Sequence, residues 1–121
     1  MPIQNILVVD DSPTDRQHLT DMLAKSGYKV ATAESAEEAF AKVKQLKPDL
    51  VLMDVVMPGQ NGFQATRELS KNESTKHIPV IICTTKGQET DKVWGMRQGA
   101  QDYVVKPVNQ ADLLAKISKL G

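Results

Sequence analysis

Three aspartates stand directly after two apolar runs of this sequence, and their number and type predict a metal site suited to phosphoryl chemistry. Asp10 and Asp11 follow the run at 6–9, and Asp54 follows the run at 50–53. Carboxylates that lie close together repel one another unless a cation neutralises them, and a single lysine would not be enough. Hard oxygen ligands without a nearby His or Cys favour Mg²⁺, or Mn²⁺, over zinc.

The role of each acid follows from its chemistry. Asp54, at the end of its strand, is the candidate nucleophile, because a carboxylate can form an acyl phosphate. Asp10 and Asp11 would hold the metal ion. The backbone carbonyl of Val56 could complete the protein's ligands, since the side chain of this residue offers none.

A hydroxyl and an ammonium follow two further apolar runs. Thr84 can donate a hydrogen bond to phosphoryl oxygens, and Lys106 can neutralise one of these oxygens. Any one of these residues alone would be interpreted as a turn residue, a helix cap or a solvated lysine, as Asp49 is here after Pro48. Three acids, a hydroxyl and a lysine at successive strand ends favour the functional interpretation.

The apolar runs that end at these residues are short and continuous, which is typical of strands buried on both faces of a parallel sheet. Amphipathic stretches lie between them. Ser12 with Pro13 predicts the start of one helix, and the capping box of Ser35 with Glu38 predicts the start of the next. The strands are expected at 6–9, 30–33, 50–53, 80–83 and 103–105, and the remaining helices at 62–71, at 90–98 and from Asn109 onwards.

Five strand–helix units in series predict an α/β fold of the flavodoxin-like (βα)5 kind. It is a doubly wound parallel five-stranded sheet, order 2-1-3-4-5, with helices on both faces. Strands one and three are then neighbours at the point where the strand order reverses. Because the working residues of such sheets lie beyond the carboxyl ends of the strands, Asp10, Asp11 and Asp54 are expected to converge there.

Composition argues against several other classes of protein. The chain has 121 residues, which fits one domain, and its 15 basic residues balance its 15 acidic ones, which argues against nucleic-acid binding. The single cysteine, Cys83, cannot form an internal disulfide and is expected in the core. No signal-peptide pattern or membrane-spanning apolar run is present, so a cytoplasmic protein without membrane insertion is predicted.

Four motifs resemble the receiver domain of two-component response regulators, in order and with the expected spacing along the whole chain. They lie at 8–12, 52–62, 84–85 and 103–107. The resemblance implies that a histidine kinase phosphorylates Asp54. It also implies the ligands of a bound Mg²⁺ ion, which are Asp10, Asp11, Asp54 and the carbonyl of Val56.

The same resemblance assigns a switch to the later motifs. Thr84 and Tyr103 would form the switch pair, and Lys106 would contact the phosphoryl group. In this family, phosphorylation draws the hydroxyl inward and lets the aromatic ring turn in behind it. The peptide bond between Lys106 and Pro107 is expected to be cis. Val56 and Lys86 border the path of the hydrolytic water, so they bear on the phosphate lifetime.

Residues 1–121 are expected to form a single, monomeric receiver domain with no effector domain and no enzymatic activity beyond its own phosphorylation and dephosphorylation. The segments 62–67 and 89–100 are similar to stand-alone receivers of type IV pilus twitching-motility systems, which work by contact as chemotaxis CheY does. This likeness implies a CheA-like sensor histidine kinase and a downstream protein target on the face of helix four, strand five and helix five. A phosphate sink or a phosphorelay intermediate is the alternative.

Three other classes of protein fit less well. An aspartyl-phosphate hydrolase needs a second acid two residues after the nucleophile, where this chain has Val56. A flavin carrier of the flavodoxin type would not place Asp10 and Asp11 at its phosphate cradle. A pseudo-receiver, with a purely structural role, would not be expected to keep Asp10, Asp11 and Asp54 together with Lys106.

Trp94 is interpreted as the anchor of the fourth helix, with a hot spot for a partner as the alternative. His18 and His77 are interpreted as surface residues rather than phosphorelay histidines.

Overall fold

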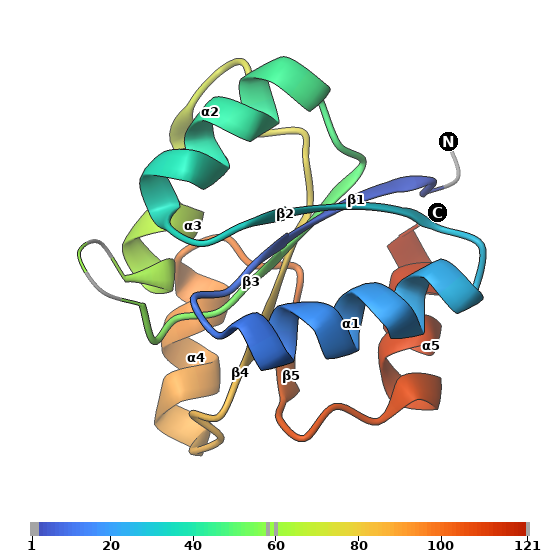
Figure 1. Cartoon of the computed structure of the whole chain (residues 1–121). Helices are drawn as coiled ribbons and strands as arrows, with labels where there is room; N and C mark the ends of the chain where they lie inside the picture. Colours follow the sequence, from blue (N-terminus) through green and yellow to red (C-terminus); the bar gives the residue numbers. More distant parts are fainter. Residues whose placement is uncertain (1–2, 58, 60, 121) are drawn as a thin grey trace.

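The computed structural model describes residues 3–57, 59 and 61–120 of the chain. The strands in this part form one parallel sheet in the order β2-β1-β3-β4-β5, which confirms the predicted topology (Figure 1). The strands are β1 (Asn5–Val9), β2 (Lys29–Ala33), β3 (Leu50–Met53), β4 (Val80–Thr84) and β5 (Asp102–Val105).

Helices cover both faces of the sheet, as predicted. In Figure 1, α1 and α5 lie on one face, and α2, α3 and α4 lie on the other. The helices are α1 (Pro13–Lys25), α2 (Ala36–Leu46), α3 (Gly62–Lys71), α4 (Glu89–Arg97) and α5 (Gln110–Leu120).

The continuous apolar strands pack against both helix layers, because successive side chains of a strand point to opposite faces. Leu7 and Val9 of β1 face the cluster of α2 and α3, whereas Ile6 and Val8 face the cluster of α1 and α5. Cys83 lies in the second cluster, where burial raises the pKa of its thiol to about 12. The expectation of a core cysteine is therefore confirmed.

Side-chain caps start the helices where the sequence predicts them. Ser12 Oγ accepts a hydrogen bond of 3.3 Å from the N–H of Asp15, and Ser35 Oγ accepts one of 3.2 Å from Glu38. Each cap satisfies one of the N–H groups that a first helical turn leaves unpaired. The caps fix where α1 and α2 begin relative to the ends of β1 and β2.

The fourth helix corrects one expectation, because Trp94 is not its anchor. Within α4, all of which the structure describes, Gly95 is the buried residue. A Cβ atom there would lie 2.8 Å from Cδ1 of Ile82, so the helix backbone itself packs against the sheet. The neighbouring side chains therefore point outward, and Val93, Trp94 and Met96 are 45%, 50% and 46% exposed.

Asp49 does more than occupy a turn. Its carboxylate accepts hydrogen bonds from the N–H groups of Gln4, at 3.0 Å, and Asn5, at 2.9 Å, which ties the start of β3 to the start of β1. These bonds hold the pKa of Asp49 below its usual value. In the part of the chain that the structure describes, no helix has the length and apolar character to cross a membrane.

Candidate functional site

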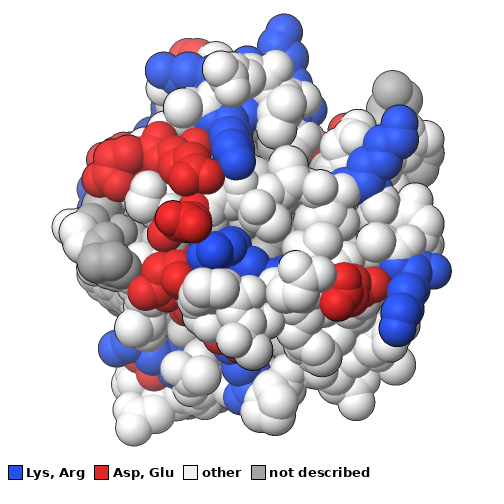
Figure 2. Space-filling model, viewed as in Figure 1, with Lys and Arg blue, Asp and Glu red and all other residues white. Residues whose placement is uncertain are grey.

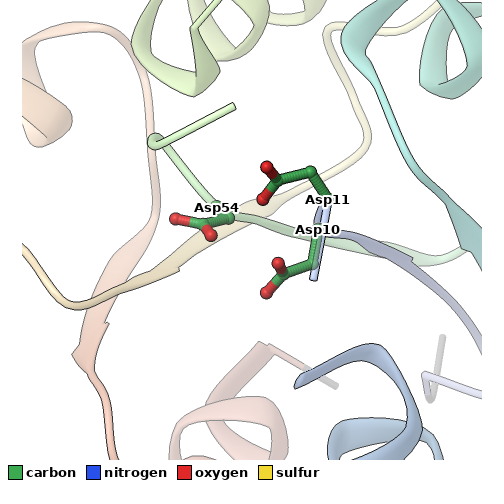
Figure 3. Close-up of side chains that lie close together, drawn as sticks. All are labelled: Asp10, Asp11 and Asp54. Atoms are coloured by element: carbon green, nitrogen blue, oxygen red, sulfur yellow. The ribbon is translucent and has the colours of Figure 1, made fainter. Parts of the chain in front are cut away.

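Asp10, Asp11 and Asp54 lie side by side at the carboxyl ends of two neighbouring strands (Figure 3). β1 and β3 pair in register, with Val9 opposite Met53, so the residues that follow them meet at one edge of the sheet. One carboxylate oxygen from each aspartate lies within 4.8 Å of the others. Asp10 and Asp54 are buried and Asp11 is exposed, so the cluster is open to solvent on one side.

The donor set suits a hard divalent cation. Carboxylate oxygens are the ligands that Mg²⁺ prefers, and His and Cys are absent from the cluster found among the described residues. The N–H of Val56 donates a hydrogen bond of 3.1 Å to Oδ1 of Asp54, so the backbone of Val56 lies beside this acid. The three carboxylates therefore fit Mg²⁺ or Mn²⁺.

Lys106, which follows β5, brings one positive charge to this cluster. Its Nζ atom lies 2.5 Å from Oδ2 of Asp10, 2.8 Å from Oδ2 of Asp15 and 3.3 Å from Oδ2 of Asp54. Burial alone would lower the pKa of Lys106, but the hydrogen bonds to Asp10 and Asp15 outweigh it and raise the pKa. The lysine therefore stays an ammonium ion.

One ammonium does not balance the carboxylates around it. Burial raises the pKa of Asp10, and the negative charge of Asp54 adds to the rise against the hydrogen bonds from Lys106 and Ser12. Figure 2 shows more acidic side chains gathered on the left of this face, where α2 begins in Figure 1. The first turn of α2 carries Glu37 and Glu38. This excess of negative charge favours a bound cation.

Asp15 is a site residue that the sequence analysis missed. It stands three residues after Ser12, in the first turn of α1, and this turn lies beside the strand ends. The only signal in the sequence is the spacing of Ser12 and Asp15, which matches the capping-box pattern with Asp in place of Glu. In the structure the carboxylate of Asp15 contacts Lys106 instead.

The β3–α3 connection is held close to Asp54 by Gly62. A Cβ atom on Gly62 would lie 2.0 Å from the carbonyl oxygen of Asp54, which leaves no room for any side chain. The N–H of Gly62 donates a hydrogen bond of 3.2 Å to the carbonyl of Val55. Pro58 and Gln60, which belong to the motif at 52–62, lie outside the described residues.

Thr84 and Tyr103 are linked through the main chain of one residue, Lys86. The hydroxyl of Tyr103 donates a hydrogen bond of 2.6 Å to the carbonyl of Lys86, and the N–H of Lys86 lies 3.5 Å from Oγ1 of Thr84. The Tyr103 ring is 7% exposed, and burial raises the pKa of its hydroxyl to about 12. The ring of Tyr103 therefore lies inward in this structure.

Other predicted residues lie where the sequence suggests. The N–H of Lys106 donates a hydrogen bond of 2.8 Å to the carbonyl of Thr84, which joins the ends of β4 and β5 beside the acids. The Lys106–Pro107 peptide bond is cis, the form that the resemblance implies. His18 and His77 are exposed, and neither belongs to the acidic cluster.

Comparisons with known proteins agree on one family. Residues 6–118 match the family described as the response regulator receiver domain. The chain is 60% identical over 113 residues to Protein PilH of Pseudomonas aeruginosa, and the match covers 93% of each chain. It is also 36% identical over 119 residues to the chemotaxis protein CheY of Thermotoga maritima, with 98% of each chain covered.

A solved structure supports the same assignment. The crystal structure of a putative response regulator from Chloroflexus aurantiacus superposes with a TM-score of 0.92 at 31% sequence identity. The match covers 99% of this chain and 98% of the other. From the converging acids, the sheet order and these comparisons together, the chain belongs to the receiver-domain family of response regulators, the CheY-like proteins of two-component signalling.

Proposed function

We propose that this chain is a stand-alone response regulator, which accepts a phosphoryl group on Asp54 and then changes its contacts with a protein target. Receiver domains as a family interact with histidine kinases and downstream targets. The observation that carries the proposal is the cluster of Asp10, Asp11 and Asp54 within 4.8 Å, with the Lys106 ammonium bound to two of them. Neither a turn nor a helix cap would require this convergence.

Asp10, Asp11, Asp54 and the backbone carbonyl of Val56 are the proposed ligands of Mg²⁺, or Mn²⁺, in this chain. The bound ion supplies positive charge that offsets the charge of phosphoryl oxygens. Val56, two residues after Asp54, is 49% exposed. Asp11 is exposed as well, so a cation can reach the cluster from solvent.

In the proposed transfer, Asp54 is the nucleophile, and Lys106 and Thr84 bind the phosphoryl oxygens. An oxygen of the Asp54 carboxylate attacks phosphorus and forms the new P–O bond. The P–N bond of the donor phosphohistidine breaks, and its electron pair returns to the imidazole nitrogen. Lys106 donates a hydrogen bond to one phosphoryl oxygen, and the hydroxyl of Thr84 donates a hydrogen bond to another. Lys106 lies within 3.3 Å of Asp54 before the transfer.

The proposed output face is formed by α4, β5 and α5. Its exposed apolar residues on α4 are Val93, Trp94 and Met96, and apolar side chains of this kind are common in binding surfaces. Tyr103 links this face to the site through Lys86. The target is therefore proposed to be a protein that contacts this apolar strip, and the balanced net charge gives no support for a nucleic acid.

The pathway is proposed from the resemblance to the twitching-motility receivers and from the 60% identity to PilH. We propose a CheA-like kinase as phosphodonor and chemotaxis-like control of type IV pilus motility as the context. The match covers 93% of PilH and 98% of CheY, which supports a single receiver domain over 1–121. We further propose that this domain is a cytoplasmic monomer without catalytic activity toward other molecules.

One observation favours a second candidate, the phosphate sink. Tyr103 is already buried and bound to the carbonyl of Lys86. If the ring does not move on phosphorylation, the output face changes little. The chain would then act by accepting phosphoryl groups that would otherwise remain on another response regulator. The two candidates share the chemistry at Asp54 and differ in whether α4 responds to it.

Intact mass spectrometry tests the shared chemistry. The chain is incubated with acetyl phosphate with and without Mg²⁺, in parallel with Asp54→Asn and with Asp112→Asn as the matched control on α5. A Mg²⁺-dependent gain of one phosphoryl group is expected in the wild type and in Asp112→Asn, and none in Asp54→Asn. Should no variant gain mass, beryllofluoride with Mg²⁺ is added, and an unchanged NMR spectrum would leave the chain a pseudo-receiver.

A further inference from the structure

We propose that Asp15 is a positioning residue, which competes with the phosphorylated Asp54 side chain for the Lys106 ammonium. The inference rests on the proposed function, because it concerns how Lys106 is shared before and after phosphorylation. Asp15 lies outside the three acids that form the cluster, and it is the second nearest carboxylate to Nζ of Lys106.

All three N–H groups of the Lys106 ammonium are engaged in hydrogen bonds. It has three N–H donors, and three carboxylates accept them: Asp10 at 2.5 Å, Asp15 at 2.8 Å and Asp54 at 3.3 Å. The Lys106 side chain is 10% exposed, so water offers little alternative. A phosphoryl oxygen on Asp54 can accept from Lys106 only if one of these contacts lengthens.

Asp15 is the partner that can release the lysine at least cost. Its side chain is 43% exposed, whereas that of Asp10 is 1% exposed. A carboxylate released at Asp15 is solvated at once, whereas Asp10 would be left with its Oδ2 atom buried and unpaired, because its remaining donor, the N–H of Ser12, binds Oδ1 at 2.9 Å. The cap from Ser12 holds the backbone of Asp15 in the first turn of α1, so the acid stays within reach of Lys106 afterwards.

The consequence is a restraint on phosphorylation. In the unphosphorylated chain, Lys106 lies 0.5 Å closer to Asp15 than to Asp54, by the difference between the two distances. Removing the charge of Asp15 leaves the ammonium free to turn toward the phosphoryl group. Ion pairs open to solvent contribute about 0.2–1 kcal/mol, so a phosphoryl analogue should bind about 1.4- to fivefold more tightly to Asp15→Asn than to the wild type.

The test measures the dissociation constant of beryllofluoride, an analogue of the phosphoryl group on aspartate, by NMR titration in saturating Mg²⁺. Asp112→Asn is the matched control, because Asp112 also lies 2.8 Å from a lysine, Lys116, but on α5. Tighter binding is expected in Asp15→Asn alone. Equal affinity in the wild type, Asp15→Asn and Asp112→Asn would overturn the inference.

A double-mutant cycle shows whether Asp15 acts through Lys106. In a Lys106→Met background, Asp15→Asn should no longer change the affinity for beryllofluoride. In the parent chain, Asp15→Glu keeps the negative charge, so its affinity for beryllofluoride should lie between those of the wild type and Asp15→Asn. An equal gain in the Lys106→Met background would mean a general charge effect and would also overturn the inference.

A second cycle needs no metal. Urea unfolding without Mg²⁺ should show that Asp15→Asn and Lys106→Met are non-additive, because the two side chains are paired in the unphosphorylated chain. Additivity would contradict the pairing itself. If the wild type binds no beryllofluoride at all, the proposed function fails with this inference, whereas binding without an Asp15 effect removes this inference alone.

Discussion

The backbone of Gly95 lies directly against the ring of Tyr103. A Cβ atom at position 95 would lie 3.1 Å from both Cδ2 and Cε2 of that ring, which is tighter than an ordinary van der Waals contact. The hydroxyl on this ring donates a hydrogen bond to the carbonyl of Lys86, in the loop between β4 and α4. A residue without a side chain in the middle of α4 therefore allows the aromatic ring to lie inward while the helix stays packed.

Gly95→Ala is expected to destabilise the chain by up to about 2 kcal/mol. Overpacking a tight contact costs about 1–3 kcal/mol, and the better helix propensity of alanine returns about 1 kcal/mol. Urea unfolding measures the change, and the NMR signals of the Tyr103 ring show whether it has moved. Higher stability with unchanged ring signals would contradict the close contact.

The control for this substitution removes the ring. In a Tyr103→Ala background, Gly95→Ala should destabilise less, because the ring atoms at 3.1 Å are gone and only the contact with Ile82 remains. A loss as large as in the parent chain would instead assign the clash to Cδ1 of Ile82, which would lie 2.8 Å from the added atom.

Tyr103→Ala is expected to bind beryllofluoride at Asp54 but to transmit less of the change to α4. The ring connects β5 to the loop after Thr84 through the carbonyl of Lys86, so its removal breaks that link. NMR shifts of the α4 backbone, with and without beryllofluoride and Mg²⁺, measure the transmission. Tyr103→Phe keeps the ring and loses only the hydrogen bond. Wild-type shifts in Tyr103→Ala would mean that α4 responds by another route.

Gly62→Ala is expected to lower the free energy of unfolding by about 3 kcal/mol and to weaken Mg²⁺ binding. The added Cβ would lie 2.0 Å from the carbonyl oxygen of Asp54, and a backbone atom cannot rotate away. Urea unfolding and Mg²⁺ titration measure the two effects. Gly27→Ala is the control: its φ is +95° but no atom lies within 4 Å, so it should lose stability without a change in Mg²⁺ affinity. Normal Mg²⁺ binding by Gly62→Ala would argue against coupling of this glycine to the site.

Mg²⁺ is expected to raise the thermal unfolding midpoint of the wild type. A ligand that binds the folded chain stabilises it by about 2.7 kcal/mol at one hundred times its Kd. Asp11→Asn should remove most of this gain and leave the metal-free midpoint nearly unchanged, because Asp11 is exposed. Differential scanning fluorimetry with a Mg²⁺ series tests this, with Asp112→Asn as control. A full gain in Asp11→Asn would exclude Asp11 as a ligand.

Asp49→Ala is expected to destabilise the chain by about 1 kcal/mol at pH 7, through the two lost hydrogen bonds to Gln4 and Asn5. Because these bonds lower the pKa of Asp49, its contribution is present above the unfolded pKa of about 3.9 and is lost as the pH falls through the lower folded pKa. Urea unfolding across this range should show the two proteins converge at acid pH. A difference that grows on acidification would reverse the sign and refute the account.

The architecture could be predicted because several local signals agree. The N-cap signals at Ser12 and Ser35 and the continuous apolar runs fix where helices and strands begin, and the serial order of the units fixes the topology. The convergence of Asp10, Asp11 and Asp54 follows from that topology, because neighbouring parallel strands end at the same edge.

Other features could not be predicted, because they depend on contacts between residues far apart in the chain. Asp15 and Lys106 are 91 residues apart, and nothing near Asp15 in the sequence marks it as a lysine partner. The inward position of Tyr103 depends on the missing side chain of Gly95, for which the sequence predicts only a place in the helix expected at 90–98. The same close packing turns Trp94 outward, against the expectation that it anchors α4.

Trp94 is the one tryptophan of the chain, and it is half exposed on the helix that forms part of the proposed output face. Its fluorescence emission therefore reports the environment of α4 with no background from another indole. Burial of this ring by a bound protein should shift the emission to shorter wavelength and protect it from soluble quenchers. The chain thus carries its own optical probe of target binding, and candidate partners can be ranked in solution without labels.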